Sequence, residues 1–378
     1  MRIYLDHNAT TPVRHEVVDA MADVLRNGFG NPSSVYEEGT AMRARLETAR
    51  AQIASLLRAE AREIRFTGGA TEANNTLLLG VLSEGDHVVT TEVEHPSVTV
   101  PLEQLEARGV AVTRIAPDAD GCVAADDVLG AIGPATKLVS VIWANNETGA
   151  LQPIEAIAAG AKERGVLVHS DATQGVGKLV IDLSRVPLDF LSTSAHKLGG
   201  PKGAGALFVR NGAEVPAYLL GGGQEKGLRG GTENTSGLVG FGVACALAEA
   251  ELDDRLARYA ALRDRLWRGL KAEIEGLRWN GDPKRALVNT LNVEFEGVAG
   301  EVLVQALDLE GVAVSAGAAC HSGSIDPSQV LTAMGRTPEQ ARASLRLSVG
   351  HGLDEDAIDA AIALFARLVP RVRERENA

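Results

Sequence analysis

The chain has 378 residues, of which 45% are hydrophobic and 23% charged, a composition typical of a globular protein. Its net charge of −13 argues against a surface that binds nucleic acid or anionic membranes. The start of the chain turns acidic at Asp6 before a signal-peptide core could form, and no apolar run approaches the ~20 residues of a transmembrane helix. Three cysteines without a CxxC pair indicate neither a disulfide framework nor a zinc site, so we expect a reducing, cytoplasmic location.

The first part of the chain alternates polar loops with helical patterns. A short apolar strand starting at Ile3 leads into polar turn residues and Pro12, which suits the first turn of a helix. A loop rich in glycine, asparagine and proline covers 28–34, and the apolar spacing over 43–57 predicts a helix.

A repeating unit of apolar strand, polar loop and helix follows, with strands expected at 63–66, 87–90, 137–143, 166–169, 190–194 and 205–209. Strands that alternate with helices predict a mainly parallel sheet with helices on both faces. In such sheets ligands bind beyond the carboxyl ends of the strands, where the polar clusters of this chain fall. We therefore expect these clusters to form one site.

The second half begins with a glycine-dense loop at 221–234, which is typical of lids, phosphate loops and subunit contacts. Residues 238–270 read as helical, and we place a domain boundary within them. The remaining residues, from about 255, have their own alternation of helices and strands and predict a second, smaller domain.

Two features of the central region indicate chemistry. Lys197 lies at a strand-to-turn junction, a placement that suits an amine that forms a Schiff base, although most lysines are solvated surface residues. The run from Thr67 to Thr71 opens a helix with two glycines and is a candidate phosphate cradle, or simply a turn. Neither a GxGxxG motif nor a P-loop occurs, which argues against NAD and ATP chemistry.

Single polar residues at other strand ends have both a chemical and a structural interpretation. Asp171 could hold a proton on a heterocyclic nitrogen or cap a helix. His95 could act in catalysis, by stacking on a flat ring or by shuttling protons, or it could be a turn residue. Arg346 could bind a substrate carboxylate or form a surface ion pair. His169 and Asp171 lack a third ligand at plausible spacing, so no metal site is expected.

Cys320 differs from the other two cysteines. It lies in a small, polar segment at 315–324, where a reachable thiol beside His321 could form the reactive thiolate, or where a small residue could fill a tight turn. Cys122 stands in an acidic turn that opposes thiolate formation, and Cys245 lies in an apolar helix.

Taken together, these residues resemble the cysteine desulfurases of the NifS/IscS type, pyridoxal-phosphate enzymes of the class V aminotransferase family. The resemblance covers essentially the whole chain. Its motifs are LDHNATT at 5–11, GNPSS at 30–34, TE at 71–72, EHP at 94–96, NNETG at 145–149, SAHK at 194–197, GGTEN at 230–234 and SAGAACHSGS at 315–324.

The resemblance implies an α/β fold of type I: a large domain with a mainly parallel seven-stranded sheet flanked by helices, plus a smaller α+β domain. It places the pyridoxal-phosphate-binding domain at 15–254, and the small domain, with the cysteine loop, at 1–14 and 255–378.

The resemblance also implies roles for single residues. Lys197 would form the Schiff base with pyridoxal 5'-phosphate, and Cys320 would accept sulfur. The other implied residues are Asp171 at the ring nitrogen; Gln174 and Asn145 near the ring hydroxyl and substrate; His95 on the ring; Ala70, Thr71, Ser194 and His196 at the phosphate; Thr232 from the second subunit of a homodimer; and Arg346 with Asn8 at the substrate carboxylate.

The implied reaction converts L-cysteine to L-alanine, with Lys197 removing the Cα proton and sulfur remaining on Cys320 as a persulfide. A sulfur-acceptor protein such as an iron–sulfur scaffold would be the partner, although thiolation pathways remain open. The alternatives are another class V enzyme, namely an aminotransferase, a selenocysteine lyase or a kynureninase-like hydrolase, and a catalytically idle scaffold. His7 stands where the family commonly has asparagine, and Ala195, Ala316 and Ala318 are further departures.

Overall fold

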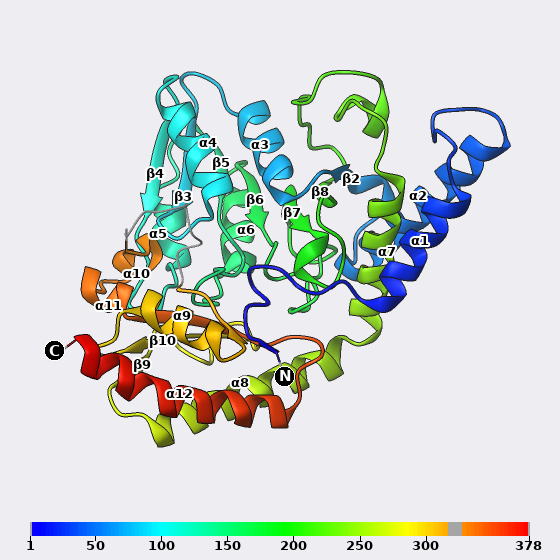
Figure 1. Ribbon diagram of the computed structural model, residues 1–378. Coiled ribbons are helices and arrows are strands. Elements are labelled where there is room, and N and C mark those ends of the chain that lie inside the picture. The colour runs from blue at the N-terminus through cyan, green and yellow to red at the C-terminus, as the bar shows by residue number, and fades with distance from the viewer. Residues whose placement is uncertain (1, 317–326, 377–378) are drawn as a thin grey trace.

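The computed structural model describes residues 2–316 and 327–376. It contains a central seven-stranded sheet with helices on both faces and, below it in Figure 1, a smaller sheet covered by α8 (Leu252–Glu273), α9 (Gly300–Leu309) and α12 (Glu355–Glu376). This is the predicted α/β fold class.

The central sheet has the strand order β2-β8-β7-β6-β5-β3-β4. Neighbours from β4 to β7 are parallel, and β8 runs antiparallel to both β7 and β2. The sheet is therefore mainly parallel, as the alternation of strands and helices predicts. Its strands are β2 (Ile64–Thr67), β3 (His87–Thr91), β4 (Ala111–Ile115), β5 (Thr136–Ser140), β6 (Leu167–Asp171), β7 (Phe190–Ser194) and β8 (Gly205–Val209).

Helices cover both faces of this sheet, which is why its inner strands read as nearly continuous apolar runs. Residues of α3 (Ala70–Val81) and α4 (Pro96–Glu106) pack on one face against Val88 and Leu207. Residues of α2 (Glu37–Leu57), α6 (Ile154–Glu163) and α7 (Thr235–Ala250) pack on the other face against Val89 and Phe208. Adjacent residues of one strand thus serve opposite faces. The helices α1 (His15–Asn27) and α5 (Ala125–Gly130) complete this part.

The smaller sheet has the antiparallel order β12-β10-β9, formed by β9 (Leu277–Trp279), β10 (Thr290–Phe295) and β12 (Ser344–Ser348). A separate parallel pair joins β1 (Ile3–Tyr4) to β11 (Val312–Ala313). Ile3 and Leu5 belong to the same hydrophobic core as residues between Tyr259 and Val372. The N-terminal strand therefore packs with the C-terminal part of the chain, while the boundaries at 15 and 255 stay a prediction. The helices α10 (Gln329–Ala333) and α11 (Pro338–Arg342) lie at its edge.

The helical region expected at 238–270 is two helices rather than one. α7 and α8 meet at an angle of 77°, with Glu251 between them. Arg14 donates to both carboxylate oxygens of Glu251 at 2.9 Å, and Arg255 binds the same carboxylate at 3.0 Å. This buried arginine cluster explains a bend that apolar periodicity does not reveal.

None of the described helices is by itself long and apolar enough to cross a membrane; the bent pair α7 and α8 passes that test only when the two are joined.

Gly205 sets the distance between β8 and the turn before α3. A Cβ atom on Gly205 would lie 2.5 Å from the Cα atom of Gly69 and 2.8 Å from the main-chain oxygen of Thr193. Because both neighbours are backbone, we expect Gly205→Ala to destabilise the protein by about 1–3 kcal/mol, measured as a lower unfolding midpoint in urea. Gly133→Ala is the matched control, since a Cβ atom there meets nothing within 4 Å. Equal midpoints for the two variants would contradict the close approach.

Candidate active site

The strand ends of the central sheet enclose a cavity of about 570 Å³. This volume is within the range of small-molecule sites. The side chains that line it come from the loops after β2, β3, β5, β6 and β7, as expected for ligands at the carboxyl ends of parallel strands. Among them are Ala70, Thr71, His95, Asn146, Asp171, Gln174, Ser194, His196 and Lys197.

Lys197 ends the short 3-10 helix η2 (Ala195–Lys197) that follows β7 and lines the cavity. Its Nζ donates to the main-chain oxygens of Asn8 at 2.6 Å and Ala9 at 2.8 Å. Burial, and then the charge of Arg346, lower the pKa of Lys197 to about 8, against the opposing effects of Asp6 and Asp171. The neutral fraction of this amine near pH 7 is therefore larger than that of an ordinary lysine, as a nucleophilic or basic lysine requires.

Asp171 is the last residue of β6 and is 3% exposed. One carboxylate oxygen accepts from the main-chain nitrogen of Thr173 at 3.0 Å, and the other accepts from Nδ2 of Asn74 at 2.8 Å. No cation is paired with it in the described residues, so the carboxylate remains available to a cationic or N–H group in the cavity. The sequence interpretation missed Asn74; its position three residues after Thr71 on α3, facing the sheet, is the signal that indicates it.

The turn from β2 into α3 forms the end of the cavity suited to a phosphate group. Gly69 caps α3 with φ 151°, a conformation that favours glycine, so that Ala70 and Thr71 form the first turn of a 12-residue helix. The N–H groups and the dipole at a helix N-terminus attract anions. Ser194 and His196 line the same cavity, and burial, with Lys197 next, lowers the pKa of His196 to about 4.

His95 is the N-cap residue of α4, and its Nδ1 accepts from the main-chain nitrogen of Ser97 at 3.1 Å. Burial lowers the pKa of His95, and the charge of Lys197 lowers it further, while Asp171 raises it. The ring is therefore neutral near neutral pH, which suits stacking on a flat ring.

Gln174, three residues after Asp171, lines the cavity and is hydrogen-bonded to the N-terminal segment. Its Nε2 donates to the main-chain oxygen of Asn8 at 2.9 Å, and its Oε1 accepts from Nζ of Lys178 at 2.8 Å. Lys178 is 4% exposed, and burial places its pKa well below the usual range. The sequence interpretation did not single out this second buried amine.

The structure corrects the prediction for Asn145. This side chain is fully buried: Nδ2 donates to the main-chain oxygen of Val93, and Oδ1 accepts from the main-chain nitrogens of Glu147 and Thr148. It braces the loop after β5 and does not line the cavity. Asn146, the next residue, lines the cavity instead.

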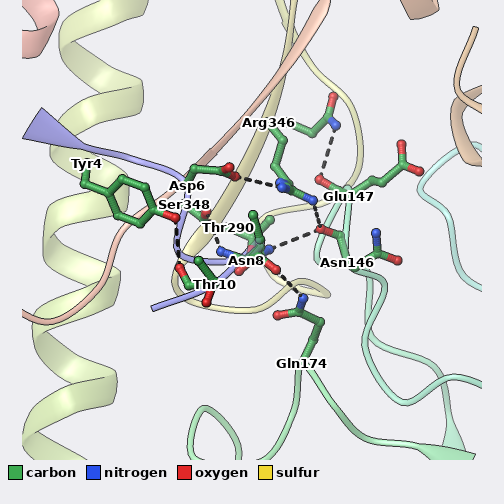
Figure 2. A network of polar contacts seen from close by, with 12 residues as sticks. Tyr4, Asp6, Asn8, Thr10, Asn146, Glu147, Gln174, Thr290, Arg346 and Ser348 are labelled. Atoms are coloured by element: carbon green, nitrogen blue, oxygen red, sulfur yellow. Dashed lines mark hydrogen bonds and ion pairs between the residues drawn. The ribbon is translucent and has the colours of Figure 1, made fainter. Parts of the chain in front are cut away.

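Asn8 and Arg346 belong to a polar network beside the cavity (Figure 2). Asn8 donates from Nδ2 to Thr290 at 2.9 Å and to the main-chain oxygen of Asn146 at 3.3 Å, while Oδ1 accepts from Asn289. With these groups satisfied, Asn8 braces the network rather than lining the cavity, which argues against its predicted contact with substrate.

Arg346 lies on β12 and is 3% exposed. Its guanidinium forms an ion pair with Asp6 at 2.7 Å and donates to the main-chain oxygen of Asn146 at 3.0 Å (Figure 2). Arg346 thus adjoins the cavity through Asn146 without being one of its lining residues. Its predicted role at the substrate carboxylate stays a prediction.

Two further predicted residues are Thr232 and Cys320. Thr232 is exposed and lines a neighbouring cavity of about 120 Å³ together with Gly68 and Gly203, which also line the main cavity. Cys320 lies outside the described residues. The described ends of that segment adjoin the site: the main chain of Ser315 pairs with that of Arg346, and Ser328 donates to the side chain of Glu147.

The cavity therefore combines a lysine of lowered pKa, a carboxylate without a paired cation, a neutral imidazole and a helix N-terminus. These groups suit covalent capture of a carbonyl group and proton transfer next to it, with an anion held at the helix end. Among the residues described, no three or more His, Cys, Asp and Glu side chains are grouped to hold a metal ion.

The chain is similar to known proteins over nearly its full length. The model of the family "Aminotransferase class-V" matches residues 3–360. A cysteine desulfurase IscS from Methanosarcina thermophila is 41% identical over 375 residues, covering 98% of this chain and 93% of that protein. A solved NifS-like protein superposes with a TM-score of 0.92 at 32% identity, covering 98% of this chain and all of that one. The structure titled "SspA in complex with cysteine" has a TM-score of 0.82 at 36% identity, with 93% and 99% covered.

The lowered pKa of Lys197 has a measurable consequence in the protein freed of cofactor. We expect reductive methylation of Lys197 at low reagent concentration to rise with pH around a midpoint near pH 8, because the amine loses its proton as pH rises through its pKa. Mass spectrometry of the peptide that contains Lys197 measures the modification, and the same peptide in urea provides the control with an ordinary lysine. Arg346→Leu should move the midpoint upward, since the Arg346 charge lowers this pKa. A midpoint near 10.5 in the folded wild-type protein would contradict the assignment.

Proposed function

The chain belongs to the class V aminotransferase family and, within it, to the cysteine desulfurases, and from this we propose that it converts L-cysteine to L-alanine and transfers the sulfur as a persulfide on Cys320. The observation that carries the proposal is the placement of Lys197 and Asp171 in one cavity that is also lined by the N-terminus of α3. A similar solved protein is titled as a complex with cysteine, which supports the choice of substrate.

Pyridoxal 5'-phosphate is the cofactor of this family, and the residues present fit it. Gly69 adopts a conformation that side chains rarely allow, and Gly205 leaves no space for a Cβ atom against it. The hydroxyl of Thr173, a residue that lines the cavity, is buried without a hydrogen-bond partner among the described residues. These features suit an aldehyde on a ring that carries a phosphate group. The glycine turn leaves room for the phosphate, the Thr173 hydroxyl has a hydrogen bond to offer, and the half-buried Lys197 amine can react with the aldehyde.

The residues that would hold the cofactor are Lys197 at its aldehyde carbon, Asp171 at the ring nitrogen, His95 on the ring face, Gln174 and Asn146 near the ring hydroxyl, and Ala70, Thr71, Ser194 and His196 at the phosphate. When bound, pyridoxal phosphate supplies an electron sink for the charge left on the substrate Cα.

Side chains of this protein would carry out proton transfer, protonation of the ring nitrogen and binding of the substrate carboxylate. Lys197 moves the Cα proton, because its pKa near 8 lets the amine accept and return a proton near neutral pH. Asp171 is buried at the end of β6 with no paired cation among the described residues, so its carboxylate is placed to favour a protonated nitrogen beside it. Arg346, held by Asp6, provides the guanidinium for the substrate carboxylate.

Sulfur transfer is assigned to Cys320. Its thiolate attacks the sulfur of the bound substrate, so that an S–S bond forms as the Cβ–S bond breaks and the electron pair of that bond returns to the alanine product. L-Cysteine and the thiol thereby give L-alanine and the persulfide, with all atoms balanced. The flanks of the segment at Ser315 and Ser328 adjoin Arg346 and Glu147, which supports delivery of this thiol to the site.

We further propose that the persulfide passes to a sulfur-acceptor protein such as an iron–sulfur scaffold, in the cytoplasm. The IscS names of the similar proteins support this assignment. A thiolation pathway would use the same persulfide, and co-purified partners of the full-length enzyme would distinguish the two.

A homodimer is proposed as the working form, with Thr232 contributed to the neighbouring subunit's phosphate site. Its support is a set of exposed apolar side chains near α1 and the start of α2, on the right of Figure 1: Leu25 is 73% exposed, Phe29 85% and Val35 91%. Leu220, in the loop that carries Thr232, is 82% exposed. Exposed apolar groups of this size favour burial against a second copy.

The activity is checked by incubating the enzyme with L-cysteine, quantifying alanine and locating the persulfide by peptide mass. We expect Lys197→Ala to lower kcat by about 10²–10⁴-fold, the range for loss of a positioned general base. Cys320→Ser should abolish the persulfide and lower alanine formation, because no thiol is present to take the sulfur.

Cys122→Ser is the matched control for the thiol, since Cys122 is buried and burial raises the pKa of its thiol. A persulfide that persists in Cys320→Ser, or wild-type turnover to a keto acid instead of alanine, would refute the proposed function.

The dimer is checked by sedimentation velocity. We expect the wild-type enzyme to sediment with about twice the 39.6 kDa mass of the chain, and Phe29→Glu to shift it to monomer, because a buried charge destabilises the contact. Leu309→Glu is the control, as Leu309 is equally exposed, at 88%, but lies on α9 with the smaller sheet. A wild-type protein that is monomeric at micromolar concentration would contradict the proposal.

A further inference from the structure

A buried amide joins two of the side chains that face the cavity. Asn74, on α3, has no exposed surface, and its Nδ2 donates both to the carboxylate of Asp171 and to Oγ of Ser97, each at 2.8 Å. Ser97 Oγ in turn lies 2.8 Å from Nδ1 of His95. The three contacts connect the end of β6 to the start of α4.

The orientation of the Asn74 amide follows from its neighbours. An ionised carboxylate only accepts hydrogen bonds, so the group that faces Asp171 is the NH₂ group and not the carbonyl oxygen. Oδ1 of Asn74 is then buried without a hydrogen-bond partner among the described residues. A buried, unpaired carbonyl group destabilises a fold. Any stabilisation from the Asn74 side chain therefore comes from the two hydrogen bonds that its NH₂ group donates.

The same chain of hydrogen bonds fixes the proton on His95. Nδ1 accepts from the main-chain N–H of Ser97 at 3.1 Å and therefore carries no proton. Ser97 Oγ accepts from Asn74, so its own hydrogen is free to donate to Nδ1. The proton of the neutral ring is thus on Nε2.

We propose that Asn74 and Ser97 form a positioning bridge that locks His95 in its Nε2-protonated tautomer and fixes its place relative to Asp171. With Nδ1 occupied by two donors and Nε2 already protonated, His95 has no free lone pair to act as a base, and the Cα proton falls to Lys197. The tautomer of His95 follows from the hydrogen-bond geometry alone. The assignment of the Cα proton to Lys197 rests on the proposed function.

The bridge is tested on the holoenzyme by NMR of ¹⁵N-histidine, with the His95 signals assigned by their loss in His95→Gln. We expect an unprotonated Nδ1 and a protonated Nε2 in the wild-type protein. Ser97→Ala removes a donor to the neutral ring and should raise the pKa of His95 by about half a unit to one unit. Ser97→Thr, which keeps the hydroxyl, should restore the wild-type value. The charged groups that act on this ring, Asp171 of β6 and Lys197 of η2, are unchanged in each variant.

Kinetics add a second measurement. Asn74→Ala removes a hydrogen bond to a charged carboxylate and should lower kcat about tenfold. Asn75→Ala is the control: it is the next residue of α3, and its amide donates at the surface to the main-chain oxygen of Thr71. An Nδ1-protonated His95 in the wild-type protein, or a His95 pKa equal in Ser97→Ala and wild type, would overturn the bridge. If wild type made no alanine from cysteine, the proposed function would fail while the NMR result stood.

Discussion

The main-chain oxygen of Asn8 is the acceptor on which the geometry of the site depends. It binds both Nζ of Lys197 and Nε2 of Gln174, while the side chain of Asn8 holds Thr290 and the Asn146 segment. A buried carbonyl requires partners, and here the partners are two side chains of the cavity. Because β1 packs with the core of the smaller sheet, this one turn ties that core to the strand ends of the larger sheet. The amine of Lys197 is therefore positioned by a segment 189 residues away along the chain.

The charges around this turn are unevenly distributed. Lys197, Lys178 and Arg346 are half-buried or buried near one another, whereas Asp6 and Asp171 are the carboxylates that oppose them at Lys197. Burial and the neighbouring cations lower the pKa of both lysines, which is how a lysine becomes a base near neutral pH. The ion pair with Asp6 holds the Arg346 guanidinium in place beside the cavity.

Sequence reasoning predicted the fold class and the convergence of polar clusters because both follow from local patterns: buried strands followed by polar loops. It failed where irregular backbone determines which way a single side chain points. After β5 ends at Ser140, the chain leaves the sheet, so strand alternation no longer tells which member of the Asn145–Asn146 pair faces the cavity. Asn74 was missed because its partner Asp171 is 97 residues away: the position of Asn74 on α3 indicates that it faces the sheet but not which residue it binds. At the bend between α7 and α8, Glu251 is bound by Arg14, which is 237 residues away in sequence.

The two cores contribute differently to the chemistry. The elements of the large sheet provide the end of the cavity suited to a phosphate group, together with Asp171 and His95. Close backbone contacts there, such as Gly205 against Gly69, leave the main chain little freedom to move. Arg346 and the described flanks of the Cys320 segment come from the chain that packs with the smaller sheet. An aminotransferase and a desulfurase of one family could share the first set of residues unchanged. The choice between these two reactions therefore depends on the second set, in which we propose that Arg346 binds the substrate carboxylate and Cys320 accepts the sulfur.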